Sequence, residues 1–456
     1  MKLPLSRITE FLNASATGID PRAVAIGYSI DSRTIRPGEL FFAVKGETLD
    51  GHDFVDQALG KGAIAAVVSQ ENPPRSDLPL IRVDDTLLAL QTLATAVRRL
   101  WGKSLIGVTG STGKTTTKEA IAHVLASRYR VHKSEGNFNN HFGLPLMLLK
   151  LEPDHDIAVV EMGMSHAGEI AALGKIAQPE IGVVTNVAPV HLEFFDSVAG
   201  IARAKYELIE SLPTTGTAVL NADDEYVSQF GRDFRGKVVP YGLAAVASVR
   251  AENIESRGQD GSIFEVVAGN SREVVRLPLL GEHNVYNSLA AIAVGMESGL
   301  SLREASSAFA SLEPADKRGQ VVQVGNITVI NDCYNCNPTA LRAMTDALAN
   351  MPAKRRIVVA GAMLELGPTG EDLHRECGRY IAVKKIDFLL GVRGSARQMV
   401  EAAREAGMQA EFVNTPEEAG EWLARETRDG DVVLMKASRG VKLERALDAW
   451  KRPAGA

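Results

Sequence analysis

LIGVTGSTGKTTTKE, residues 105–119, is the stretch of this 456-residue chain that decides its fold. An apolar run typical of a buried strand breaks into glycines and ends at Gly113-Lys114-Thr115, where we expect a helix to begin. Glycines in such a turn let backbone N–H groups point at phosphate oxygens, and the helix N-terminus adds partial positive charge. Lys114 would neutralise the β- and γ-phosphates, and the Thr115 hydroxyl would bind Mg²⁺. The stretch therefore predicts a site for a nucleoside triphosphate.

The spacing of this loop is shorter than that of the usual P-loop. The usual loop has four residues between its first glycine and the Gly-Lys pair, and position 108, where that glycine would stand, is Val. The loop here is G-x-x-G-K-T. The alternative is a glycine-rich turn that binds nothing, but the preceding strand and following helix count against it. We expect seven residues to contact the nucleotide phosphates: Gly110, Ser111, Thr112, Gly113, Lys114, Thr115 and Thr116.

Length and composition narrow the class of protein. A chain of 456 residues is too long for one ordinary core, and 45% hydrophobic with 23% charged residues is typical of a globular protein. The net charge of −6, with no basic run, argues against nucleic acid as the main partner. No apolar stretch approaches the ~20 residues that a membrane span needs. We therefore expect no membrane span.

The start of the chain and its cysteines indicate the compartment. Apolar residues at 5, 8, 11 and 12 form a helical stripe without the apolar core of a signal peptide. Three cysteines do not make a disulfide framework, so we expect a reducing cytoplasm. Cys333 and Cys336 form a C-x-x-C pair, for which zinc binding or redox chemistry is the alternative. Three cysteines cannot complete a Cys₄ zinc site, which favours two incidental thiols.

Strand-like and helix-like segments alternate through three blocks, so we predict three α/β domains: residues 1–100, 101–313 and 314–456. The first is small and contains a proline-marked loop at 71–77. The central one, a P-loop mononucleotide-binding domain, has expected strands at 157–160, 181–185 and 218–220 in a doubly wound, mostly parallel sheet. The C-terminal one, Rossmann-like, has expected strands at 328–330, 356–360, 388–390 and 432–435.

Three polar residues follow the central strands. Glu161 ends an apolar run, and ligands of open α/β sheets bind at the carboxyl ends of strands, so its carboxylate is a candidate Mg²⁺ ligand. The alternative is a solvated glutamate. His191 follows the next strand, although a lone histidine is more often structural. Lys205 lies on an expected helix at 198–208; an ammonium cannot bind Mg²⁺, and it could instead pair with a phosphate or with Glu207.

The short phosphate loop, with Thr109 before it and Thr116-Thr117 after it, resembles that of the Mur ligase family, ATP-dependent amide-forming enzymes of cell-wall and folate metabolism. TNVAPVHLE at 185–193 and ARAKYELI at 202–209 carry the same resemblance. It implies ATP and two Mg²⁺ ions as cofactors. It also implies that Thr115 and Glu161 bind one Mg²⁺, and that Glu161, His191 and a Lys205 carbamylated by CO₂ bind the second.

Further segments extend the resemblance into the last third of the chain. GEHNVYN at 281–287 implies that Asn284 and Asn287 lie beside the adenine; helix capping is the alternative. KRGQ at 317–320 and INDCYNCNP at 330–338 imply that Arg318 reaches the γ-phosphate and that Asp332 lies at the ribose. Cys336 stands where the family usually has alanine, a small-for-small change that we expect to be silent.

DSRTIRPGELFFAVKG at 31–46 resembles the UDP-sugar-binding domain of the later members of the family. The resemblance implies that Ser32 and Arg33 contact the diphosphate, and that the backbone of Phe42, Lys45 and Gly46 holds the uracil. Without it, the segment is equally typical of a surface hairpin with a charged turn.

Within the family, the chain is most similar to the branch that joins D-alanyl-D-alanine to a UDP-N-acetylmuramoyl-tripeptide through an acyl phosphate, for peptidoglycan synthesis. Five segments carry this similarity: 110–119, 136–145, 161–164, 361–367 and 436–440. Thr112 departs from the usual asparagine. A monomer is the family's default, and Tyr334, Asn335 and Asn337 are candidates for holding the dipeptide. The resemblance implies five catalytic residues: Lys114, Glu161, His191, Lys205 and Arg318.

Two other functions stay open. A sibling enzyme adds the third amino acid, but it typically carries a D-N-P-R motif where this chain has NCNPT at 335–339. A regulatory ATPase without amide formation is the other, and it leaves the segment at 31–33 unexplained.

Overall fold

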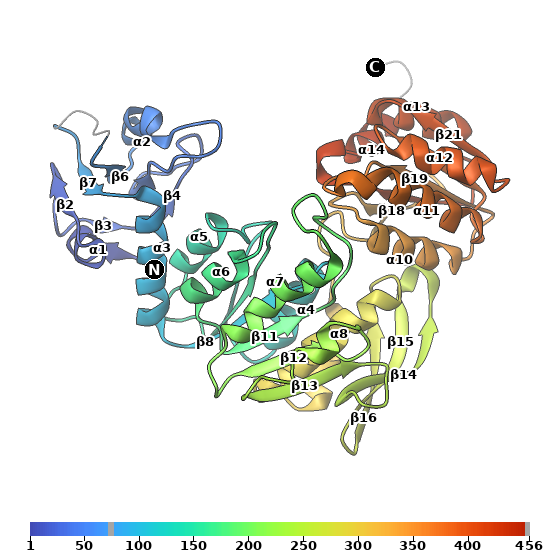
Figure 1. Cartoon of the computed structure of the whole chain (residues 1–456), viewed down its shortest axis with the longest axis horizontal. Helices are drawn as coiled ribbons and strands as arrows, with labels where there is room; N and C mark the ends of the chain where they lie inside the picture. Colours follow the sequence, from blue (N-terminus) through green and yellow to red (C-terminus); the bar gives the residue numbers. More distant parts are fainter. Residues whose placement is uncertain (72–76, 452–456) are drawn as a thin grey trace.

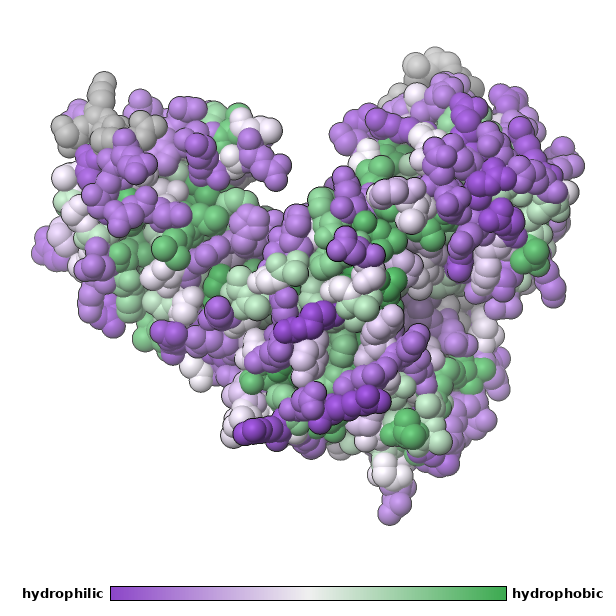
Figure 2. Space-filling view, viewed as in Figure 1, coloured by the Kyte–Doolittle hydropathy of each residue, from purple (hydrophilic) through white to green (hydrophobic). Residues whose placement is uncertain are grey.

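The structure, a computed structural model, describes residues 1–71 and 77–451. Most of the predicted proline loop, residues 72–76, lies outside these. The chain forms three α/β parts, each built on its own sheet, and the first and last stand as two arms on either side of the central one (Figure 1). Figure 2 shows an open hollow between the arms. No helix in the described ranges is long and apolar enough to cross a membrane.

The N-terminal part contains a five-stranded sheet in which strands β4 to β7 run parallel and β2 is antiparallel. Its spatial order is β2 (Ser15–Thr17), β7 (Leu80–Val83), β6 (Ala65–Ser69), β5 (Glu39–Phe42) and β4 (Gly27–Ser29). β1 (Leu3–Pro4) pairs with β3 (Val24–Ala25), and the helices are α1 (Leu5–Leu12) and α2 (Val55–Gly60). Because β4 and β5 are parallel, they do not form the surface hairpin that was the alternative for residues 31–46.

Helix α3 (Thr86–Trp101) joins the N-terminal part to the central one (Figure 1). Asp85 caps its N-terminus, and the buried Arg98 donates hydrogen bonds to the backbone oxygens of Ala177 and Gln178 and pairs with Glu180 at 2.8 Å. One hydrophobic core runs from the N-terminal sheet through α3 into the central part. The boundary near residue 100, like that near 313, therefore stays a prediction.

The central sheet has nine strands, parallel from β9 to β14 and antiparallel at β15 and β16. Its order is β16 (Ser271–Leu277), β15 (Ser262–Ala268), β14 (Val249–Ser256), β13 (Lys237–Gly242), β12 (Thr217–Asn221), β11 (Ile181–Val184), β8 (Ser104–Thr109), β10 (Ile157–Glu161) and β9 (Val131–Lys133). These bounds confirm the three strands predicted here.

Helices cover both faces of the central sheet, and the strands alternate between two cores accordingly. Leu105 packs on the side of α5 (Gly143–Leu149), α6 (Glu169–Ala177) and α7 (Val198–Glu210). Ile106 packs on the side of α4 (Lys114–Leu125), α8 (Glu282–Glu297) and α9 (Leu302–Ser307). Neighbouring side chains of a strand point to opposite faces, so both faces must be apolar. The sheet is thus doubly wound, as predicted.

The C-terminal part is a six-stranded sheet, parallel except for the edge strand β17. The order is β17 (Gln320–Val324), β18 (Ile327–Asp332), β22 (Asp431–Lys436), β19 (Arg355–Gly361), β20 (Phe388–Val392) and β21 (Ala410–Val413). Its helices are α10 (Pro338–Ala349), α11 (Gly370–Ala382), α12 (Ala396–Glu405), α13 (Pro416–Glu426) and α14 (Glu444–Trp450). The predicted strands and Rossmann-like architecture are confirmed.

Candidate functional site

The predicted phosphate loop lies between the carboxyl end of β8 and the first turn of α4. Two of its glycines leave no room for a side chain unless a neighbouring side chain moves. A Cβ at Gly110 would lie 1.8 Å from the Oγ1 of Thr185, and one at Gly113 would lie 2.5 Å from the Oδ1 of Asn287. Gly113, with φ +79°, is the N-cap of α4 and caps it with no side-chain hydrogen bond. The first N–H groups of α4 are therefore left for a ligand, as an anion site requires.

The segment after β11 holds this loop in shape. Thr185 donates to the backbone oxygen of Thr112 at 2.6 Å. The amide of Asn186 accepts from the Thr112 N–H at 2.9 Å and donates to its hydroxyl at 2.7 Å, and the Ser111 hydroxyl accepts from the Ala188 N–H at 2.9 Å. We did not predict Thr185 and Asn186 as site residues. The sequence feature that could have identified them is their position as a polar pair directly after β11, the strand that pairs with β8.

Gly113→Ala is expected to weaken ADP binding at least about tenfold, or ~1.4 kcal/mol. The added methyl group would displace Asn287. The left-handed backbone at position 113 would also lower the free energy of unfolding by ~1 kcal/mol once the residue is alanine. Isothermal calorimetry with ADP measures the binding, and a thermal melt measures the folding.

Gly269→Ala is the matched control, because Gly269 also has a left-handed φ of +58° and a Cβ added there would meet no atom within 4 Å. It carries the backbone strain without the clash, so it should lose stability and keep ADP affinity. Wild-type affinity in Gly113→Ala would contradict the assignment of the loop.

Glu161 lies at the carboxyl end of β10, where the sequence predicted it, and is only 4% exposed. Its two carboxylate oxygens accept hydrogen bonds from the Thr115 hydroxyl at 2.7 Å and the Asn139 amide at 2.8 Å. Asn139 was not predicted as a site residue. The contact brings two of the predicted metal ligands together, and the alternative of a solvated Glu161 is wrong.

Lys114 folds back over its own loop, donating to the backbone oxygen of Gly110 at 2.8 Å. Burial lowers the pKa of Lys114, the nearby Glu161 carboxylate opposes that shift, and the Arg318 guanidinium adds to it. Charges affect each other's pKa only at close range. The Arg318 charge therefore acts on Lys114 from the C-terminal part, to which Arg318 belongs.

Lys205 is 2% exposed. No hydrogen bond or ion pair to its amine is found among the residues that the structure describes. Burial, and then the nearby Lys114 charge, lower the pKa of Lys205 well below its usual value. Glu207, the carboxylate suggested as its partner, instead accepts from the N–H groups of Gly168 and Ala171 at 2.7 and 2.9 Å. Lys205 is thus a buried amine without a counter-ion among the described residues.

His191 lies near another glutamate of the chain. Its Nδ1 is 2.6 Å from Oε2 of Glu365, a residue of the C-terminal part, and this contact lowers the pKa of the Glu365 carboxyl. In the described parts of the chain, no three His, Cys, Asp or Glu side chains are grouped so that they could hold a metal ion. Of the predicted metal ligands Thr115, Glu161, His191 and Lys205, the structure shows a hydrogen bond between Thr115 and Glu161 and, among the described residues, no hydrogen bond or ion pair of His191 or Lys205 with either.

A cavity of about 260 Å³ opens beside the phosphate loop, between the central and C-terminal parts. Asn284 and Asn287 line it, and the Asn287 amide donates to the Asn284 side chain at 2.8 Å. Both lie inside α8, whose N-cap is Gly281, so the capping alternative is wrong. His283 also lines the cavity; burial lowers its pKa to about 4, so it presents a neutral ring. Thr112, Gly113, Thr116, Arg318 and Asp332 complete the predicted residues along its wall.

The C-terminal wall of this cavity carries charges in fixed positions. Asp332, at the carboxyl end of β18, accepts a hydrogen bond from Lys436 at the end of β22. Burial is the largest single influence on the pKa of Lys436 and lowers it, but the charge and hydrogen bond of Asp332 together with Cys336 outweigh burial, so that pKa is raised. The Arg318 guanidinium lies 4.0 Å from the ring centre of Tyr334, and that of Arg439 lies 5.4 Å from it. Lys436 and Arg439 belong to the segment 436–440, which carried the family resemblance, but neither was predicted as a site residue.

Two asparagines of the 333–337 segment have local roles. The Asn337 side chain caps α10, accepting from the Ala340 N–H at 2.9 Å, and the Asn335 side chain accepts from the Cys336 N–H at 2.9 Å.

Cys333, Cys336 and Cys377 are buried free thiols, and burial raises their pKa values, to about 12 for Cys336. Thiols in this state are unreactive. No metal-binding group is found around them in the described ranges.

The residues predicted to bind a UDP-sugar lie on the N-terminal part, apart from the phosphate loop. The buried Ser32 hydroxyl donates to Gln57 at 2.7 Å. The Arg33 side chain is 82% exposed and pairs with Asp31 at 2.8 Å. The Phe42 ring is buried in the core, so only its backbone could meet a ligand. The backbones of Lys45 and Asp50 pair in an isolated antiparallel β-bridge, and the Gly46 N–H donates to the Leu49 oxygen at 2.9 Å. The segment is therefore a tight surface turn.

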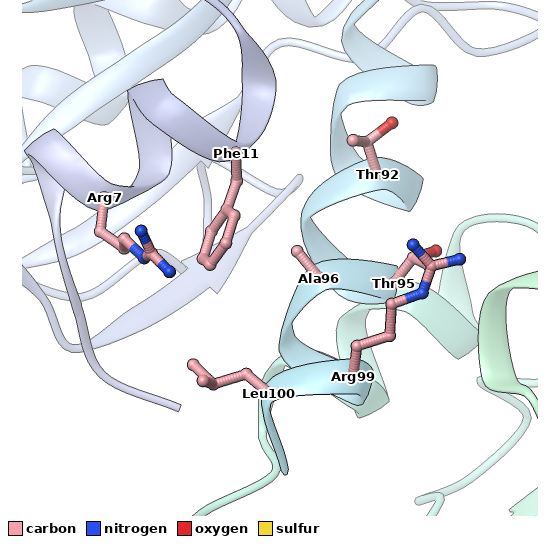
Figure 3. Close-up of a pocket in the computed structure, with 7 residues that line it drawn as sticks. All are labelled: Arg7, Phe11, Thr92, Thr95, Ala96, Arg99 and Leu100. Atoms are coloured by element: carbon pink, nitrogen blue, oxygen red, sulfur yellow. The ribbon is translucent and has the colours of Figure 1, made fainter. Parts of the chain in front are cut away.

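A second hollow, of about 560 Å³, lies between α1 and α3, with Phe11 of α1 turned toward Ala96 of α3 (Figure 3). Two arginines, Arg7 and Arg99, line it, and Arg7 is paired with Glu10 at 2.6 Å and stacked on Phe11. None of the predicted site residues lines it.

Three family models match the chain in series. The model described as "Mur ligase family, catalytic domain" matches residues 26–98, "Mur ligase middle domain" matches 108–295, and "Mur ligase, glutamate ligase domain" matches 317–439.

Curated relatives match over nearly the whole chain. A UDP-N-acetylmuramoyl-tripeptide–D-alanyl-D-alanine ligase of Bacillus subtilis (strain 168) is 37% identical over 434 residues, which is 93% of this chain and 92% of the relative. The enzyme of that name from Escherichia coli (strain K12) is 35% identical over 466 residues, covering 98% of both.

Solved structures agree with the sequence relatives. A crystal structure of MurF from Acinetobacter baumannii superposes with a TM-score of 0.91 at 29% identity, covering 99% of each chain. MurF ligase from Thermotoga maritima in complex with ADP superposes with a TM-score of 0.84 at 30% identity, covering 94% of this chain and 97% of that one.

Proposed function

Since the chain belongs to the Mur ligase family, we propose that it joins D-alanyl-D-alanine to a UDP-N-acetylmuramoyl-tripeptide at the expense of ATP, in peptidoglycan precursor synthesis. The observation that carries the proposal is the cavity where the phosphate loop, the two α8 asparagines and Arg318 meet. Relatives of that name match 93% and 98% of the chain, and the Thermotoga relative was solved in complex with ADP.

The chemistry is activation of a carboxylate. A tripeptide carboxylate oxygen attacks the γ-phosphorus of ATP, the bond to the β-phosphate oxygen breaks, and ADP leaves with the bonding electron pair. The amine of D-alanyl-D-alanine then attacks the carbonyl carbon of the acyl phosphate. The resulting tetrahedral intermediate loses inorganic phosphate and the amine loses a proton, which leaves an amide.

Lys114, Arg318 and the N-terminus of α4 would stabilise the charge on the transferring phosphoryl group. Fixed cations and N–H groups placed before the reaction contribute more than mobile water can. Asn284 and Asn287 would hold the adenine, and Asp332 the ribose. Arg318 comes from the C-terminal part, so docking of that part would complete the site.

Mg²⁺ would be held by Thr115 and Glu161, and a second Mg²⁺ by Glu161, His191 and a carbamylated Lys205. Hard cations prefer oxygen ligands, and Glu161 supplies two carboxylate oxygens beside the loop. When bound, the two ions supply charge neutralisation at the phosphates and the substrate carboxylate.

The fit of Lys205 to this role rests on its buried amine, which has no counter-ion in the described ranges. CO₂ reacts with the neutral amine, and burial beside the Lys114 charge lowers the pKa of Lys205, which favours that form. The carbamate would place a negative charge beside Lys114, where an ammonium would be repelled.

The remaining assignments concern substrates and setting. We assign residues 1–100 to the UDP-sugar, 101–313 to ATP, and 314–456 to closure over ATP and the dipeptide. Ser32, Arg33 and the backbone of Phe42, Lys45 and Gly46 would hold the UDP moiety. We also assign the protein to the cytoplasm, as a monomer.

The test against the sibling enzyme is a product analysis by mass spectrometry. UDP-N-acetylmuramoyl-tripeptide with D-alanyl-D-alanine should give a product heavier by the dipeptide less one water. UDP-N-acetylmuramoyl-dipeptide with lysine or diaminopimelate should give none. The reverse pattern would assign the chain to the sibling reaction.

A further inference from the structure

Two loops from distant parts of the chain meet at His191. His191 lies between β11 and α7, and Glu365 follows β19 in the C-terminal part. Their side chains approach to 2.6 Å, Nδ1 to Oε2. The backbones are also close, since a Cβ added at Gly367 would lie 3.1 Å from the Cα of Glu193. The central and C-terminal parts therefore touch here through both a charged pair and the backbone.

Both members of the pair have an unfavourable backbone conformation. His191 has a φ of 55° and Glu365 a φ of 64°, in the left-handed region that non-glycine residues avoid. Such a conformation costs about 1 kcal/mol or more and persists only where the surroundings enforce it. An incidental surface pair contributes about 0–1 kcal/mol and would not explain strain at both ends.

Nδ1 of His191 is buried and makes no hydrogen bond of good geometry with the described residues, although Oε2 of Glu365 is 2.6 Å away. A small rotation of either side chain would let the Nδ1–H donate to that carboxylate, which would leave Nε2 as the nitrogen with a free lone pair. Histidines that bind metal ions usually hold their second N–H on such a carboxylate or carbonyl. Glu365, which we did not predict as a site residue, is in the position of that partner.

We propose that Glu365 is a positioning residue: it orients His191 for cation binding, so that the C-terminal part of the chain helps to build the cation site of the central part. The proposal rests on the proposed function for the role of His191. It goes beyond that function by assigning a residue of the C-terminal sheet to the central site, and by linking docking of the C-terminal part to cation affinity.

The test is Mn²⁺ binding to the full-length protein, measured by electron paramagnetic resonance in bicarbonate buffer. Glu365→Ala should weaken Mn²⁺ binding about tenfold or more, the range found for lost outer partners of metal ligands. Glu365→Gln keeps an oxygen acceptor and should stay within about threefold of wild type. If the alanine variant does not fold, Glu365→Leu tests the same loss at similar volume.

Two controls separate positioning from a structural role. Glu371→Gln removes an exposed carboxylate on the nearby α11 and should leave Mn²⁺ affinity unchanged. In a His191→Ala background, Glu365→Ala should cause no further loss. Wild-type affinity in Glu365→Ala, or an equal loss in both backgrounds, would overturn the proposal. Mn²⁺ binding needs no peptide substrate, so failure of the proposed reaction would be seen separately.

Discussion

Lys114→Ala should reduce ADP formation roughly 10³-fold, equivalent to about 4 kcal/mol of transition-state stabilisation. Its amine is the cation within the phosphate loop. In the structure this amine donates a hydrogen bond to the Gly110 backbone oxygen, a weak partner that a phosphate would replace. The measurement is steady-state ADP release with saturating substrates. Circular dichroism and a thermal melt would establish that the variant is folded. Wild-type turnover in a folded Lys114→Ala protein would contradict the role of the phosphate loop in the reaction.

Lys205→Arg should reduce turnover roughly 10²-fold or more, although it keeps a positive charge at the position. A guanidinium cannot form a carbamate, whereas a simple ion-pairing lysine would tolerate the exchange far better. Lys175→Arg, at an exposed site on α6, is the matched control and should keep full activity.

Carbamylation of Lys205 has its own direct test. Crystals of the wild-type protein grown with Mg²⁺, nucleotide and bicarbonate should show carboxylate density on its Nζ. Mass spectra are unsuitable because the carbamate loses CO₂ easily. Unmodified amine density in a metal-bound crystal, together with an active Lys205→Arg variant, would contradict the carbamate.

The sequence predicted well those features that depend on neighbouring residues. The strand before Gly110, the helix from Lys114 and the alternation of apolar strands with helices are local patterns, and the structure has them. Glu161 at the end of β10 followed from the same rule, because ligands meet parallel sheets at the carboxyl ends of strands.

The sequence could not predict contacts between side chains far apart in the chain. Asp332 and Lys436 are 104 residues apart, and His191 and Glu365 come from different sheets. No local sequence pattern identifies such pairs, because the first depends on which strands are neighbours in the C-terminal sheet and the second on how two parts of the chain pack. Asn337 shows the opposite failure, since its local role as a helix cap competes with the substrate role suggested for it.

The most direct measurement is ADP release by the purified protein with ATP, Mg²⁺ and UDP-N-acetylmuramoyl-tripeptide, with and without D-alanyl-D-alanine. The proposed amide ligase should turn over only when the dipeptide is present, because the acyl phosphate needs an amine to resolve it. ADP release at the same rate without the dipeptide, or none with it, would contradict the proposed function.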